Sequence, residues 1–110
     1  MPTDAAQLIA DLDAHPKACG MLGLRFGLGC AGTPMVSNSC ISLLENDTEP
    51  WNSEFSRWLT GACVEKHHEL DIDLPVKCRS NGETYYAIND GNETRHHTFL
   101  GALLSVLENS

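Results

Sequence analysis

The first periodic pattern in the chain has apolar residues spaced three or four positions apart, at Ala5, Leu8, Ile9 and Leu12. This spacing places them on one side of a helix. Thr3 or Asp4 can cap the first turn, because a short polar side chain there accepts a hydrogen bond from a free backbone N–H. Pro16 disfavours helical backbone in the residue before it, so we expect the helix to end there.

From Leu22 the period changes to two. Leu22, Leu24, Phe26 and Leu28 alternate with Arg25 and three glycines, which predicts a strand with one apolar face. The glycine-rich face predicts close packing of another segment on that side. Residues 35–44 fit either a helix or a strand. We favour a strand that returns from the first, giving a hairpin over residues 22–44.

The middle of the chain has the pattern of an amphipathic helix over residues 51–68. Its apolar positions recur at helical spacing, at Trp51, Phe55, Trp58, Leu59 and Ala62. Two tryptophans on one stripe predict that this helix contributes most of the apolar core.

The next segment alternates strictly. Its apolar positions are Leu70, Ile72, Leu74, Val76 and Cys78, a pattern that predicts a strand. Asn81 and Gly82 predict a two-residue type I′ turn and therefore a hairpin over residues 70–88. This turn pairs Cys78 with Tyr85 and Val76 with Ala87, pairs that we expect on the buried face. Tyr86 and Ile88 then point to the outer face. Pro75 cannot donate a ladder hydrogen bond, so its side should be an edge or a bulge.

A closing helix over residues 99–107 has little polar surface, which predicts burial on most sides, across a sheet face. The chain of 110 residues is long enough for one core. We therefore expect a single α+β domain over residues 1–110. It should contain a small antiparallel sheet of about four strands, with hairpins at 22–44 and 70–88, packed against three helices.

Charge narrows the classes of partner. Fifteen acidic and seven basic residues give a net charge of −8. Binding to a phosphate backbone depends on clustered Lys and Arg, so we expect no direct nucleic-acid partner and no anionic membrane surface. No stretch reaches the roughly 20 apolar residues of a membrane span, and the N-terminus lacks the pattern of a leader.

The five cysteines are widely spaced and odd in number. They suggest reduced, mostly buried thiols and a cytoplasmic protein.

Three motifs contain residue types that could carry chemistry. Residues 27–32 match the G-x-G-x-x-G pattern of dinucleotide sites, but the expected antiparallel hairpins do not provide the parallel fold that such a site needs. Cys63 and His67 are one helical turn apart, and His96 could complete a zinc site with them. Each of these residues also has a structural explanation. Cys30, in the glycine-rich loop, is the best candidate for a nucleophilic thiol.

The acidic run before the central helix favours a binding function. Residues 45–54 contain Glu45, Asp47, Glu49 and Glu54 and no basic residue. Together with Tyr86 and Ile88 on the outer sheet face, these acids predict a surface that binds a basic protein partner. We expect a small non-enzymatic interaction module that inhibits or regulates a larger macromolecule, without a cofactor or a metal. A homodimer formed by sheet pairing is compatible with this pattern. The alternative is a small metal- or thiol-dependent enzyme or ligand-binding protein that uses the Cys/His residues.

Overall fold

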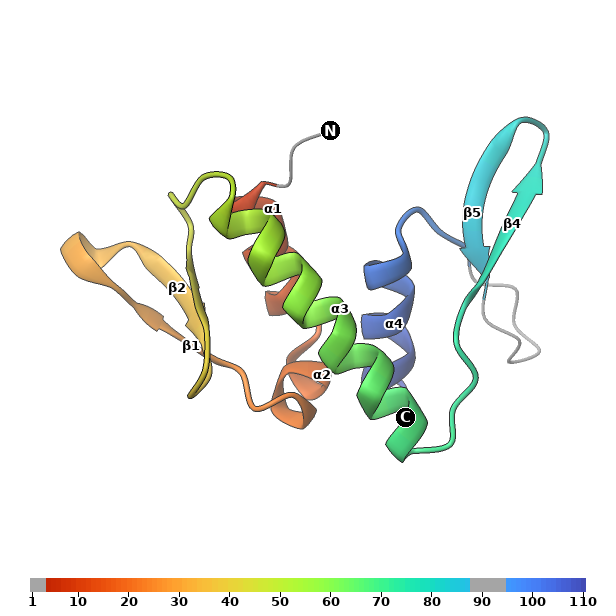
Figure 1. Cartoon of the computed structure of the whole chain (residues 1–110), viewed down its shortest axis with the longest axis horizontal. Coiled ribbons are helices and arrows are strands. Elements are labelled where there is room, and N and C mark those ends of the chain that lie inside the picture. Colours follow the sequence, from red (N-terminus) through yellow and green to blue (C-terminus); the bar gives the residue numbers. More distant parts are fainter. Residues whose placement is uncertain (1–3, 88–94) are drawn as a thin grey trace.

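The computed structural model describes residues 4–87 and 95–110. Its architecture is α+β, as the sequence predicts. Helices pack together in the centre, and two antiparallel sheets extend from opposite sides of them (Figure 1). The prediction of one sheet of about four strands was wrong, because the two expected hairpins belong to separate three-stranded sheets.

The N-terminal segment forms two helices, α1 (Ala5–Asp13) and α2 (Pro16–Met21). The side chain of Asp4 caps α1 by accepting a hydrogen bond from the backbone N–H of Ala6 at 2.9 Å. Pro16 ends one helix as predicted, and it also begins the next. Proline suits the first position of a helix, because the missing N–H would have no partner there.

The first sheet is a meander of β1 (Arg25–Leu28), β2 (Pro34–Ser37) and β3 (Ser42–Leu44). Residues 35–44 therefore contain two strands joined by a turn. Val36 pairs with Phe26 on one side and Leu43 on the other. Val36 and Leu43 are fully buried, whereas Phe26 and Leu28 are exposed. The expected apolar face of this hairpin is thus covered over only part of its length.

The central helix, α3 (Trp51–Glu69), agrees with the predicted range. The predicted strand after it was wrong in its first half. Leu70 and Asp71 form a turn, Asp71 having a φ of 56°, and residues 72–75 have no regular structure. The strand begins only at Val76, because Pro75 has no N–H to donate to a ladder.

The second sheet contains β4 (Val76–Ser80), β5 (Glu83–Ala87) and β6 (Arg95–His96), with β5 in the middle. The predicted turn is confirmed. Asn81 and Gly82 have φ values of 52° and 79°, the positive values that a type I′ turn requires. The predicted register is also confirmed, with Cys78 opposite Tyr85.

The burial of this second hairpin differs from the prediction. Val76, on the face expected to be buried, is 58% exposed. Tyr86, expected on the outer face, is half-buried, and its ring lies 5.7 Å from that of Phe99 at the start of α4 (Phe99–Glu108). The helix therefore covers the opposite face from the one that the alternation predicted. Ile88 lies outside the described residues.

The core lies between the helices and the first sheet. Helix α4 packs mainly against α2 and α3, and of the expected position across a sheet face only the contact of its start with one face of β5 and β6 is present. The largest fully buried side chains include Leu12, Leu43, Phe55, Leu59, Leu103, Leu104 and Leu107.

The molecule measures 45 × 31 × 19 Å, and its radius of gyration is 14.3 Å. A compact chain of this length would have about 13 Å, so the sheets project from the helical centre. No described helix has both the length and the apolarity to span a membrane.

Candidate functional site

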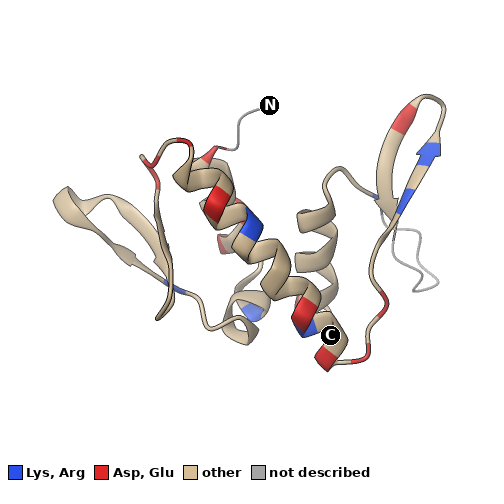
Figure 2. Cartoon of the chain, viewed as in Figure 1, with Lys and Arg blue, Asp and Glu red and all other residues tan. Residues whose placement is uncertain are grey.

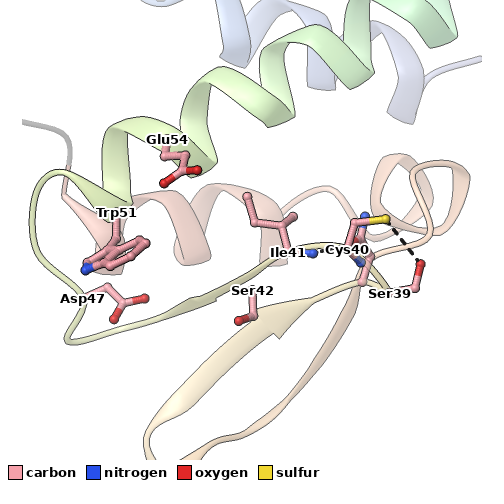
Figure 3. Close-up of a pocket in the computed structure, with 8 residues that line it drawn as sticks. Ser39, Cys40, Ile41, Ser42, Asp47, Trp51 and Glu54 are labelled. Carbon is pink, nitrogen blue, oxygen red and sulfur yellow. Dashed lines mark hydrogen bonds between the residues drawn. The ribbon is translucent and has the colours of Figure 1, made fainter.

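A pocket of about 520 Å³ lies where the turn between β2 and β3 meets the start of α3. Figure 3 shows Asp47, Trp51 and Glu54 at one end of this pocket and Ser39 and Cys40 at the other. Its lining residues are Asn38, Ser39, Cys40, Ile41, Ser42, Asp47, Trp51 and Glu54. Two carboxylates and an indole ring thus share one concave surface, and none of its described lining residues is a Lys or Arg.

Asn38 shapes the turn on one side of the pocket. Its side-chain oxygen accepts hydrogen bonds from the backbone N–H groups of Cys40 at 2.8 Å and Ile41 at 2.9 Å. The backbone N–H of Asn38 donates a hydrogen bond to the backbone carbonyl of Ile41 at 2.9 Å. Asparagine favours such turns because its side chain can replace a backbone acceptor. The turn is therefore held by local hydrogen bonds that also fix the positions of Cys40 and Ser39.

The acidic end of the pocket is also built locally. The Asp47 carboxylate accepts a hydrogen bond from the backbone N–H of Leu44 at 2.9 Å, just after β3. Trp51 and Glu54 come from the first turn of α3, three positions apart, and such residues are neighbours on a helix surface. The indole of Trp51 is 63% exposed. Its ring is thus available to a ligand beside two carboxylates.

Of the five predicted partner-binding residues that the structure describes, only two line this pocket together. Asp47 and Glu54 line the pocket, whereas Glu45 is exposed outside its lining. Glu49 accepts hydrogen bonds from the backbone N–H and the hydroxyl of Ser53, so its carboxylate serves the N-terminus of α3. Tyr86 lies in the second sheet, on the other side of the helices (Figure 1).

Six of the lining residues were not predicted as site residues, and Trp51 and Cys40 carry the most distinctive side chains among them. Its place on the apolar stripe of the helix predicts Trp51 in the core, yet this residue is among the exposed large apolar residues. The stripe that is buried contains Asn52, Phe55, Leu59, Cys63 and His67. Cys40 was one of five cysteines without a distinguishing motif. The acidic run directly before Trp51 was the only sequence signal that this ring could face solvent.

Charge is unevenly distributed over the molecule. Figure 2 shows acidic positions in the segment before α3 and then one acidic and one basic position in the first turns of this helix, Glu54 and Arg57, while β4 carries two basic positions, Lys77 and Arg79. Arg95 adds a third cation to the second sheet, on β6. The acidic pocket and the basic sheet therefore lie on opposite sides of the helices.

The residues considered for zinc do not form a joint site. Cys63 and His67 are both buried on α3, and the Nε2 of His67 lies 3.1 Å from the carbonyl oxygen of Leu103. Within residues 4–87 and 95–110, no three His, Cys, Asp or Glu side chains are grouped closely enough to share a metal ion. His96, on β6, therefore does not join them as a third ligand.

The buried thiols are poorly suited to nucleophilic chemistry. Burial, with a smaller contribution from Cys19, raises the pKa of Cys63 to about 12. Burial, followed by the charges of Glu108 and Asp13, raises the pKa of Cys19 to about 11. The thiolate is the nucleophile, so both groups are in the unreactive thiol form near neutral pH. Cys30 and Cys40 are exposed, and none of the five cysteines forms a disulfide.

The glycine-rich motif spans the end of β1 and the loop that connects it to β2. The N–H of Gly29 donates to the carbonyl of Thr33 at 2.8 Å and closes the loop, within which residues 30–32 form a short 3-10 turn. The next regular element is the strand β2, beginning at Pro34. A dinucleotide site needs the N-terminus of a helix at this point. The strand found here instead agrees with the prediction that this motif is a glycine-rich loop and not a dinucleotide site.

This pocket therefore combines an aromatic ring with two carboxylates. Its parts come from a turn, a loop and the first turn of a helix. Comparison with protein-family models, curated proteins and solved structures finds no match to this chain.

Proposed function

We propose that this chain is a protein-interaction module whose pocket receives a basic side chain from a protein partner. The observation that carries the proposal is the shared lining of Asp47, Trp51 and Glu54. Through this contact the module would inhibit or regulate a larger macromolecule. A reducing compartment such as the cytoplasm suits its unpaired cysteines.

The chemistry of the pocket favours a cation. An ammonium or guanidinium group is attracted to the face of an aromatic ring, tryptophan being the best, by about 0.5–1 kcal/mol at an exposed site. The carboxylates of Asp47 and Glu54 add charge-assisted hydrogen bonds to the same group. The pocket volume of about 520 Å³ is in the range of small-ligand sites and is ample for a single long side chain.

The net charge of the whole chain supports the same partner. A charge of −8 creates a negative potential that increases the rate of encounter with a basic surface. This long-range attraction is not specific, because every exposed carboxylate contributes to it. Specificity must come from the pocket, where the ring and the two acids stand together.

A labelled peptide of alternating arginine and glycine tests the proposal, with binding followed by fluorescence anisotropy at low and moderate salt. We expect binding that weakens as salt increases. Trp51→Ala should lower the affinity roughly two- to fivefold, the loss expected for one cation–π contact. Glu54→Gln should lower it as well.

Glu65→Gln is the matched control for Glu54→Gln. It removes the same charge from an exposed position of α3, eleven residues further along the helix. This is about 16 Å at 1.5 Å per residue, beyond the Debye length of about 8 Å at physiological salt. Equal losses from Glu54→Gln and Glu65→Gln, with no loss from Trp51→Ala, would show diffuse charge attraction and contradict the pocket. Absence of binding by the unaltered protein would overturn the proposal altogether.

A further inference from the structure

A second cavity adjoins the acidic pocket of Asp47 and Glu54, at one end of the first sheet. Its volume is about 470 Å³, and its lining consists of Gly23, Arg25, Ser37, Asn38 and Ser39. We call it the Arg25 cavity. Asn38 and Ser39 also line the acidic pocket, so the turn between β2 and β3 forms a wall of both cavities.

The side chains of the Arg25 cavity are suited to an anion. Arg25 supplies a guanidinium group with five N–H donors, and it is the only basic residue of the first sheet (Figure 2). Ser37 and Ser39 add hydroxyl groups, which can donate. The side-chain oxygen of Asn38 is already used within the turn, so its NH2 group is the part left for a ligand. None of the described lining residues is acidic.

The guanidinium of Arg25 is exposed, and within the described residues it has no carboxylate within 4 Å. The chain around it is also open. A Cβ atom at Gly23 or Gly27 would meet no atom of the described chain within 4 Å beyond the adjacent residues. Of the covering predicted for this glycine-rich face, the structure shows the Leu44 side chain at Gly29 and nothing around Arg25. Glycine in such a strand often marks a place where a ligand approaches closely.

The register of the first sheet sets the distance between the two cavities. Arg25 pairs with Ser37, and Ser37 pairs with Ser42, so these residues form a row across the three strands on one face. Ser42 lines the acidic pocket. Neighbouring strands are about 4.8 Å apart, so Arg25 lies about 10 Å from Ser42. An extended peptide covers this distance with about three residues.

We propose that the Arg25 cavity binds an oxyanion, a carboxylate or a phosphate, on the same partner segment whose basic side chain enters the acidic pocket. This inference rests on the proposed function, because the acidic pocket supplies the other contact. The guanidinium of Arg25 can hold either oxyanion through two parallel hydrogen bonds. The partner segment is therefore one that carries opposite charges three or more residues apart.

The charge of the whole chain favours such a segment over a free anion. A net charge of −8 repels an isolated carboxylate or phosphate before it reaches Arg25. A segment that also carries a base is attracted by Asp47 and Glu54 and brings its anion to Arg25 as part of the same molecule. The second contact then costs less entropy than the binding of a separate ion.

Nuclear magnetic resonance titration of isotope-labelled protein, which measures weak binding, tests the proposal with glycine-based peptides. The reference peptide carries one arginine and, four residues away, a glutamine. Two others have glutamate or phosphoserine instead of the glutamine, and each is made in both sequence orders. A fourth has glutamate but no arginine.

We expect glutamate, in one of the two orders, to raise the affinity roughly two- to fivefold over glutamine, as an exposed ion pair does. Phosphoserine should raise it at least as much, because it carries more charge. A gain from phosphoserine alone would identify phosphate as the oxyanion. The amide signals of Arg25 and Ser37 should shift with the charged peptides and not with the reference peptide.

Arg25→Gln should abolish the gain from glutamate and phosphoserine without lowering the affinity for the reference peptide. Arg79→Gln is the matched control, because it removes the same charge from an exposed position of β4, in the other sheet. This variant should keep the gain. Far-UV circular dichroism and thermal unfolding check that both variants are folded.

The outcomes separate this inference from the proposed function. Binding of the reference peptide at the acidic pocket, with no gain from either oxyanion, would overturn the inference alone. A gain that survives Arg25→Gln, or that Arg79→Gln abolishes equally, would do the same. Equally strong binding of the peptide without arginine would contradict recognition of the two charges together. No binding by any peptide would contradict both proposals.

Discussion

His67 shows how one polar side chain can be part of the core. It is fully buried on α3, and its Nε2 lies within hydrogen-bonding distance of the carbonyl of Leu103 in α4. From the sequence, His67 was a candidate zinc ligand together with Cys63 and His96. The contact instead makes it a link between two helices that are far apart in the chain.

Replacement of His67 should therefore destabilise the fold. His67→Ala removes a buried ring and a buried hydrogen bond, and we expect a loss of about 2–4 kcal/mol in the free energy of unfolding. Urea denaturation followed by circular dichroism measures this change.

The neighbouring His68 provides the control. It is exposed on the same helix, so His68→Ala should change the unfolding free energy by less than about 0.5 kcal/mol. Similar losses for the two variants would contradict the structural role assigned to His67.

Among the elements, α4 depends most clearly on a cap. Thr98 precedes the helix, and its hydroxyl oxygen accepts a hydrogen bond from the N–H of Gly101 at 3.0 Å. A Cβ atom at position 101 would lie only 2.8 Å from that oxygen. The capped first turn of α4 therefore leaves too little space for a side chain at position 101.

Thr98→Ala should remove the cap and lower the free energy of unfolding by about 1 kcal/mol. Thr98→Ser keeps the hydroxyl and should retain most of the stability. Thermal unfolding of the three proteins provides the comparison. An equal loss from both substitutions would show that the methyl group of Thr98, and not its hydroxyl, is important.

Local sequence signals predicted several helices and strands, but they did not predict the residues at which these elements begin and end. The turn at Asn81 and Gly82 could be predicted together with its register, because the need for positive φ is a property of those two residues. The alternation from Leu70 did not make a strand until Val76, because a ladder also needs a partner and a backbone donor, which Pro75 lacks. Pro16 was recognised as a helix end but not as the start of α2.

At the scale of the whole molecule, the second sheet and the helical centre should differ in stability. Val36, Leu43 and most of the buried leucines belong to the part around the helices, whereas Val76 on the second sheet is 58% exposed. Segments with few buried apolar contacts open locally at low free-energy cost.

Hydrogen exchange measured by mass spectrometry tests this difference. We expect the amides of β4 and β5 to exchange faster than those of α3 and α4. Leu59→Ala, which creates a cavity in the core, should accelerate exchange in α3 and α4 and leave the β4–β5 rates nearly unchanged. Equal acceleration everywhere would mean that the second sheet opens only with the core.

Sequence alone determined the features that depend on neighbours along the chain. The α+β class, the cap of α1, the long central helix and the Asn81–Gly82 hairpin follow from periodicity, capping and turn chemistry within a few residues. Tertiary structure decided which faces these elements bury. It exposed Trp51 beside Asp47 and Glu54, placed Tyr86 against Phe99, and left Val76 uncovered. Each of these outcomes depends on how distant segments pack, and a pattern of apolar positions shows that a face can be buried without showing what will cover it.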